Sequence, residues 1–142
     1  MTKLRGIGSP RARSIHQEII SGTLVNMWDE IKQKPAWKLM CQATVTENPN
    51  DNYPDIIVWN ESKKLVFSLE ITRNWSISYD RRKAIRLKAR FPNAEFFIYN
   101  YESGILYALK SDNTWADSRE YNIMSSLLKK PLLDYIYLPD DY

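Results

Sequence analysis

Two carboxylates, Asp55 and Glu70, stand within apolar and β-branched stretches of the sequence, where an ionised side chain is costly to bury. The two stretches, residues 53–60 and 65–72, flank a short polar turn, a pattern typical of a β-hairpin. A four-residue turn places Asp55 opposite Glu70, whereas a two-residue turn places it opposite Ser68, within diagonal reach of Glu70. Either register brings two negative charges together, and a divalent metal ion is the simpler account of such a pair. The alternative is that each carboxylate lies at a strand end, in water or capping backbone amides.

The two faces of this hairpin follow from the alternation of side chains along a strand. On the second strand, two sets of alternate residues are predicted on opposite faces. One set is Leu65, Phe67, Leu69 and Ile71, and the other is Val66, Ser68, Glu70 and Thr72. Thr72 is therefore expected to share a face with Glu70.

Length and composition describe one globular domain. The chain has 142 residues, of which 44% are hydrophobic and 26% charged, as in a soluble protein with its own core. No apolar run reaches transmembrane length, and residues 1–10 have no signal-peptide core, so we expect an intracellular, cytoplasmic protein without a membrane partner. The single cysteine, Cys41, and the single histidine, His16, exclude an internal disulfide and a zinc site of Cys and His ligands.

Basic residues gather in two blocks, although the formal net charge is only +3. Such blocks favour an anionic partner such as nucleic acid. The alternatives are a disordered start for the first block and a solvated helix face for the second. The blocks, neither of which contains an acid, are Lys3, Arg5, Arg11 and Arg13, and then Arg81, Arg82, Lys83, Arg86, Lys88 and Arg90.

Hydrophobic periodicity and breaker residues predict the remaining elements. We expect a flexible basic arm over residues 1–13 and a single domain over residues 14–142. The order helix, three strands, helix, two strands, helix (αβββαββα) predicts an α/β sandwich with a mixed sheet, in which the strands flanking the second helix pair in parallel. The expected elements are a helix over 14–34, a strand over 37–45, the hairpin over 53–72, a helix over 78–91, a second hairpin over 94–110 turning at Gly104, a final helix near 118–129 and an apolar tail over 132–138.

Helical spacing places further polar residues around the hairpin. Glu18 lies beside an apolar stripe of the first helix and is expected to face a cleft, whereas His16 is interpreted as a surface or capping residue. Lys83 borders the buried side of the second helix, and Arg82 and Arg86 point away from it.

Pro54-Asp55 at a strand start, followed by Glu70-Ile71-Thr72 in the next strand, resembles the PD-(D/E)XK nuclease superfamily. Within it the chain is most similar to the Uma-type restriction endonucleases, over about residues 14–110. Each motif is short, and their order and spacing carry the resemblance. Further shared features are His16-Gln17 with Ile20, Gly22 and Leu24 in the first helix, Leu69-Glu70-Ile71 in the hairpin, Asp80 with Lys83 in the second helix, and Pro92 to Phe97 leading into a strand.

The resemblance implies a restriction-endonuclease-like core and a Mg²⁺-dependent enzyme, with Mn²⁺ as a substitute ion, that hydrolyses phosphodiester bonds of DNA. Asp55, Glu70 and the backbone carbonyl of Ile71 would hold the ion, and Glu18 would contact it through a water. The basic side chains would track the phosphate backbone, which positions the protein without reading sequence. Those side chains are Arg5, Arg11, Arg13, Arg82 and Arg86.

The chain departs from the superfamily at Thr72, which stands where the usual lysine is found. The resemblance implies that Lys83, on the following helix, supplies the missing charge and orients the attacking water. Thr72 would hydrogen-bond that water or a phosphate oxygen.

Two other functions stay open. A catalytically inactive DNA-binding or assembly subunit on the same fold would bind DNA without needing a metal ion. A protein-binding adaptor would use aromatic side chains around Trp59, Trp75 and Tyr79, although these could equally stack on bases. Whether a homodimer is needed for double-strand cuts stays open as well.

Overall fold

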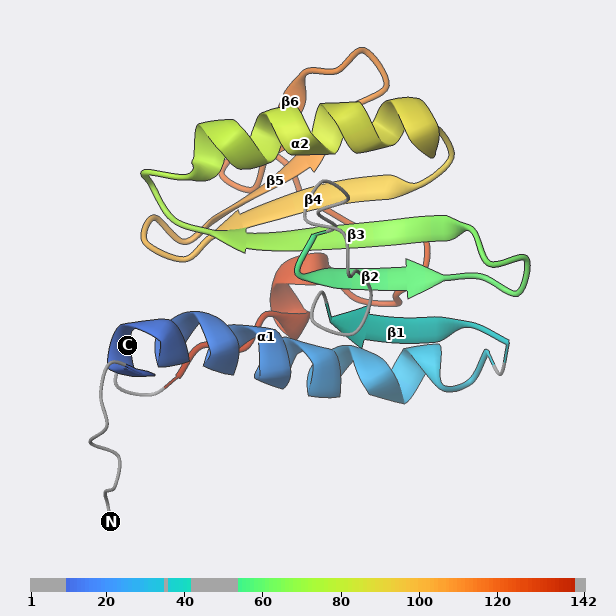
Figure 1. Cartoon of the computed structure of the whole chain (residues 1–142), viewed down its shortest axis with the longest axis horizontal. Coiled ribbons are helices and arrows are strands. Elements are labelled where there is room, and N and C mark those ends of the chain that lie inside the picture. The colour runs from blue at the N-terminus through green and yellow to red at the C-terminus, as the bar shows by residue number, and fades with distance from the viewer. Residues whose placement is uncertain (1–9, 35, 42–53, 140–142) are drawn as a thin grey trace.

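The computed structural model describes residues 10–34, 36–41 and 54–139, with the backbone alone for residues 10–14. In this part the chain forms an α/β fold with one six-stranded mixed sheet and two α-helices (Figure 1). The elements are α1 (Pro10–Ile31), β1 (Lys38–Cys41), β2 (Ile56–Trp59), β3 (Leu65–Thr72), α2 (Ile77–Arg90), β4 (Glu95–Asn100), β5 (Ile105–Leu109), β6 (Trp115–Asp117) and the 3₁₀ helix η2 (Leu132–Tyr135).

The strands lie in the sheet in the same order as in the chain, from β1 to β6. All neighbours are antiparallel except β3 and β4, which are parallel and joined by α2. The predicted strand–helix–strand unit is therefore confirmed. The second predicted hairpin is confirmed too, since β4 and β5 pair around a turn in which Gly104 has φ +73°, a conformation that suits glycine.

The β2–β3 hairpin adopts the register that the four-residue turn predicts. Ile56 pairs with Leu69, and one further step places Asp55 opposite Glu70. Near the turn the register shifts, because one residue step on β2 matches two on β3 and leaves Val66 as an extra residue. The shift moves Leu65 to the other face of the sheet and leaves Val66 against the same core as Phe67, so the predicted face is right from Phe67 onward and wrong for Leu65 and Val66.

The sheet has a hydrophobic core on each face. On one face, α1 contributes Ile19, Met27 and Ile31, which pack with alternate residues of β2 and β3 and with η2. On the other face, Ala84 and Leu87 of α2 pack in a smaller core. Figure 1 shows α1 along β1 and α2 along β4. The first core holds Ile56, Val58, Phe67, Leu69 and Ile71 of the hairpin, and the second holds Ile57, Leu65 and Phe96.

The first helix is longer than predicted at its start. It begins at Pro10, a residue that suits the first helical turn, so residues 10–13 of the predicted arm are helical. Residues 1–9 lie outside the described part, as do residues 42–45 of the predicted first strand.

The predicted final helix near residues 118–129 is wrong. The structure has strand β6 and then turns, because side chains capture the backbone N–H groups that a helix would use. Glu95 accepts from the Ser126 N–H at 2.9 Å. Glu30 of α1 accepts from the Lys129 N–H at 2.8 Å, which ties this segment to the first helix.

No helix among the described residues is both long enough and apolar enough to cross a membrane.

Gly22 of α1 provides a test of how the C-terminal segment packs. A Cβ atom at Gly22 would overlap the Cβ and ring atoms of Tyr137, whose backbone N–H donates to Thr23 Oγ1. We expect Gly22→Ala to lower the free energy of unfolding by about 1–3 kcal/mol, since overpacking outweighs the better helix propensity of alanine. Urea denaturation measures the change. Ser21→Ala, at an exposed neighbouring position, is the control and should be neutral or slightly stabilising; equal stability of Gly22→Ala and wild type would contradict this packing.

Candidate functional site

Asp55 lies immediately before β2, where the chain enters the sheet. Its carboxylate is buried, and Oδ2 accepts a hydrogen bond of 2.9 Å from the backbone N–H of Ile71. This bond joins the start of β2 to the end of β3. The alternative reading of Asp55 as a strand-end residue that binds a backbone amide is therefore correct for its position, but the side chain is not in water.

His16 of α1 lies against the same two residues. Its Nε2 is 3.2 Å from Asp55 Oδ2 and 2.8 Å from the carbonyl oxygen of Ile71. Both neighbours are acceptors, so Nε2 carries the proton and donates to them. The hydrogen bond with Asp55 raises the pKa of His16 above 6.5, against the opposing effect of burial. The reading of His16 as a surface or capping residue is wrong, because the helix directs this ring at the hairpin.

Glu70 of β3 and Lys83 of α2 form a buried ion pair beside Asp55. Lys83 Nζ donates to Glu70 Oε2 at 3.2 Å, and only 4% of the Lys83 residue is exposed. The prediction that Lys83 borders the buried side of its helix is confirmed. The other oxygen, Glu70 Oε1, is buried and has no hydrogen-bond partner. Burial, and then repulsion by Asp55, hold the pKa of Glu70 well above 4.5, against the lowering effect of Lys83.

Asp80 is a third carboxylate at this site, and the sequence did not single it out as a site residue. It lies in the first turn of α2, is buried, and has Oδ1 4.0 Å from Lys83 Nζ. Burial raises the pKa of Asp80, while the Thr72 hydroxyl and then Lys83 lower it. The spacing of Asp80 and Lys83, three residues apart on one helix, is the signal that could have placed it there.

Other predicted site residues fall in different places. Glu18 is exposed, so the expectation that it faces a cleft is corrected. The physical reason is that two residues rotate a helix by about 200°, which turns Glu18 away when His16 faces the hairpin. Arg82 and Arg86 are exposed, as predicted. Arg5 and the side chains of Arg11 and Arg13 lie outside the described part of the chain.

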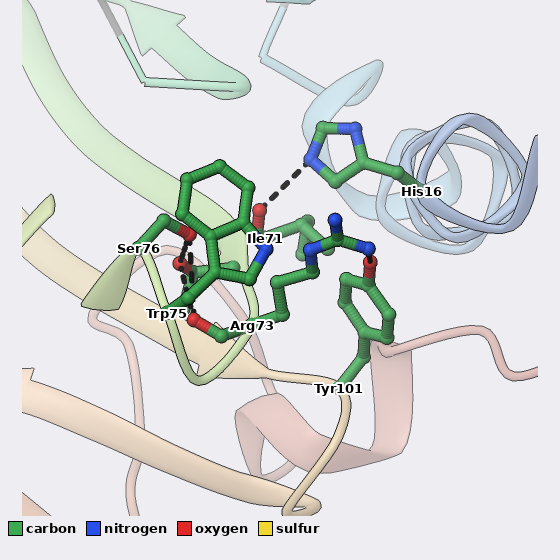
Figure 2. A pocket seen from close by; sticks show the side chains of 7 residues that line it. His16, Ile71, Arg73, Trp75, Ser76 and Tyr101 are labelled. Atoms are coloured by element: carbon green, nitrogen blue, oxygen red, sulfur yellow. Dashed lines mark hydrogen bonds between the residues drawn. The ribbon is translucent and has the colours of Figure 1, made fainter. Parts of the chain in front are cut away.

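Thr72, the last residue of β3, is buried beside the N-terminal end of α2. Its Oγ1 lies 2.8 Å from Ser76 Oγ, and its carbonyl accepts from the Tyr101 N–H at 2.9 Å. Here β3 passes into a short loop, and a pocket of about 300 Å³ opens next to the carboxylates. Figure 2 shows the ring of His16 directed at the Ile71 carbonyl on one side of this pocket. Its lining consists of His16, Ile71, Thr72, Arg73, Trp75, Ser76 and Tyr101.

The three aromatic residues of the proposed adaptor surface do not form one patch. Trp59 is partly buried and packs edge-on against Phe91, just beyond the C-terminal end of α2. Trp75 and Tyr79 lie at the opposite end of that helix and are 76% and 46% exposed. The structure therefore separates Trp59 from the other two.

Comparison with known proteins does not assign the chain to a family. No protein-family model matches the chain, and no curated protein sequence matches it significantly. An account of the function therefore depends on the residues and their geometry.

Among the described residues, no three His, Cys, Asp or Glu side chains form a group that could hold a metal ion. The predicted direct ligands are two carboxylates and the backbone carbonyl of Ile71, and Glu18, the third predicted carboxylate, is exposed. In the structure, side chains of the protein supply positive charge next to these oxygens: His16 at Asp55 and Ile71, and Lys83 at Glu70. Carboxylate and carbonyl oxygens are of the kind that bind a hard divalent cation, and the N–H groups of Lys83 and His16 are of the kind that bind a water or a phosphate oxygen.

The contact of His16 with Asp55 predicts an imidazole that titrates above pH 6.5. A raised pKa means that the contact stabilises the fold fully below pH 6.5 and loses this effect as the pH rises through the raised pKa. NMR titration can measure it directly, since the chain has one histidine. Asp55→Asn should lower the pKa of His16, and Asp29→Asn, an exposed change on the same helix, should not. Equal His16 pKa values in wild type and Asp55→Asn would contradict the contact.

Proposed function

We propose that the protein is a metal-dependent endonuclease that hydrolyses phosphodiester bonds of DNA, with a fold of the PD-(D/E)XK type. The order α1, three antiparallel strands, α2 and a parallel fourth strand supports this fold. The observation that carries the proposal is the buried pair of Lys83 and Glu70, 3.2 Å apart, next to Asp55. In this proposal Lys83, which extends from α2 to Glu70, takes over the role of the lysine that the superfamily usually has two residues after the glutamate.

The oxygens of this site suit a hard divalent cation. Glu70 Oε1 is buried without a hydrogen-bond partner, and burial, followed by repulsion from Asp55, raises the pKa of Glu70. A cation bound between them would offset both costs, and carboxylate and carbonyl oxygens are the ligands that Mg²⁺ prefers. Asp55, Glu70 and the carbonyl of Ile71 would hold Mg²⁺ or Mn²⁺. When bound, the ion would lower the pKa of a water and neutralise charge developing on the phosphate.

The side chains around these oxygens would share the remaining work. Lys83 would hold the attacking water or a phosphate oxygen by donating from Nζ, which is fixed in place by its burial and its bond to Glu70. His16 would orient the Asp55 carboxylate through Nε2. Thr72 would offer its hydroxyl, which already lies 2.8 Å from Ser76 Oγ. Arg82 and Arg86, exposed on α2, would contact phosphates.

An inactive DNA-binding subunit is the second candidate. One observation favours it. His16 and Lys83 supply positive charge next to Asp55 and Glu70, so the negative charge of the two carboxylates is offset without a metal ion. This candidate predicts DNA binding that depends on salt but is indifferent to Mg²⁺ and to Glu70→Gln.

Cleavage assays distinguish the two candidates. In Mg²⁺, we expect wild type to nick supercoiled plasmid or cut branched oligonucleotides, and Asp55→Asn and Glu70→Gln to abolish cutting because they remove metal ligands. Lys83→Met, which keeps the buried volume but not the charge, should reduce kcat by about 10²–10³-fold. Arg86→Ala is the matched control on the same helix and should raise KM with little change in kcat.

Circular dichroism should accompany these assays, because removal of one partner of a buried ion pair also destabilises a fold. Full cutting by a folded Glu70→Gln protein would contradict the assigned ligands. Wild type that binds every DNA substrate and cuts none would favour the inactive subunit.

Metal binding has a readout independent of activity. Mg²⁺ at about 100 times its Kd should stabilise wild type by about 2.7 kcal/mol, since it binds the folded state alone. Thermal unfolding should therefore show an increase in Tm with Mg²⁺ for wild type and little increase for Glu70→Gln. Glu61→Gln, an exposed change in the hairpin turn, is the control and should respond as wild type does. Equal increases in Glu70→Gln and wild type would place the ion elsewhere.

A further inference from the structure

The pocket beside the carboxylates is lined by an arginine and two aromatic residues that have no part in the proposed cleavage chemistry. It has a volume of about 300 Å³, at the small end of the range for ligand pockets, and is lined on one side by His16, Ile71 and Thr72. The other side comes from the loop between β3 and α2, which presents Arg73 and Trp75, and from Tyr101 after β4. Figure 2 shows Arg73 reaching between the rings of Trp75 and Tyr101.

Trp75 is exposed to an unusual degree for so large an apolar residue, at 76%. The loop that carries it is nevertheless held firmly. The Asn74 N–H donates to Glu102 Oε1, and Asn100 Nδ2 donates to Asn74 Oδ1, both at 2.8 Å. The loop also closes on itself through the Ser76 N–H and the Arg73 carbonyl, at 3.0 Å. The indole is therefore presented to solvent by a fixed scaffold.

Arg73 places positive charge beside this indole. Its guanidinium carbon is 5.1 Å from the centre of the Trp75 ring, and Nη1 is 3.5 Å from the hydroxyl of Tyr101. Among the described residues, Arg73 forms no ion pair with a carboxylate. An arginine held between aromatic rings, without an acidic partner, suits the phosphate of a ligand whose base stacks on a ring.

We propose that this pocket takes one unpaired nucleotide of the substrate strand, with its base against Trp75 and its phosphate on Arg73. The inference rests on the proposed nuclease function and names its substrate class: DNA that is single-stranded or branched next to the cut bond. A base within an uninterrupted duplex has both faces stacked on its neighbours and cannot offer one to Trp75 without being extruded. The pocket shares Ile71 and Thr72 with the site of cleavage, so the bound nucleotide borders the phosphate that is attacked.

The test measures DNA binding in EDTA, so that no cleavage occurs, by fluorescence anisotropy. One probe is an uninterrupted duplex. The other, the branched probe, is the same duplex ending in a single-stranded arm whose first unpaired base is 2-aminopurine. Wild type should bind the branched probe more tightly and quench the 2-aminopurine. Trp75→Ala should weaken binding of the branched probe roughly tenfold, the order of one base–aromatic stacking contact, and abolish the quenching. Trp75→Phe should retain most of both effects, and Arg73→Ala should weaken binding of the branched probe.

Trp28→Ala is the matched control, because Trp28 is 49% exposed on α1 and does not line the pocket. It should bind both probes as wild type does. Equal affinity of wild type for the two probes, or an unchanged Trp75→Ala protein, would overturn the inference even if plasmid is cut in Mg²⁺. Binding of neither probe would overturn it as well. A preference that depends on Trp75, found without any cleavage in Mg²⁺, would support the pocket and count against the nuclease alone.

Discussion

The burial of two carboxylates on one hairpin is the constraint on which the arrangement of this protein depends. Asp55 comes just before β2, where the register of the hairpin places it opposite Glu70 of β3, and each carboxylate is largely buried and would destabilise the fold if left without partners. Their partners come from three different elements. Ile71 of β3 donates its N–H to Asp55, His16 extends from α1, and Lys83 extends from α2. Both helices are thus tied through the sheet to one small group of charges, in addition to their separate apolar cores.

The sequence was sufficient for the parts of this arrangement that depend on local periodicity. Alternation along two strands predicts that Asp55 and Glu70 share a face, and both of the turn lengths considered place them within reach of each other. Helical spacing then predicts that Lys83 borders the buried side of α2. These inferences succeed because each needs only the geometry of one element or of one tight turn. Strand alternation, together with the parallel pairing expected for two strands that flank a helix, also predicts the central part of the sheet, from β2 to β4.

The sequence was insufficient wherever the rotation of an element or a competing side chain decides the outcome. Whether His16 or Glu18 faces the hairpin depends on how α1 is rotated about its axis, and the apolar residues on two sides of that helix left the rotation open. The extra residue at Val66 reverses the face of Leu65 by a register shift that strand propensity does not reveal. The segment after β6 reads as a helix, but the N–H groups of Ser126 and Lys129 bond to Glu95 and Glu30. Both acceptors lie far away in the sequence.

The backbone of Ile71 connects the carboxylates of the site to the pocket. Its N–H bonds to Asp55 and its carbonyl to His16, while the next residues, Thr72 and Arg73, form the edge of the pocket. Movement of the Trp75 loop would therefore shift the backbone that fixes the carboxylates. The bonds of Asn74 to Glu102 and Asn100 hold the loop in place. In the proposed nuclease, this preorganised loop would hold the bound nucleotide in a fixed position relative to the two carboxylates, as hydrolysis at a defined bond requires.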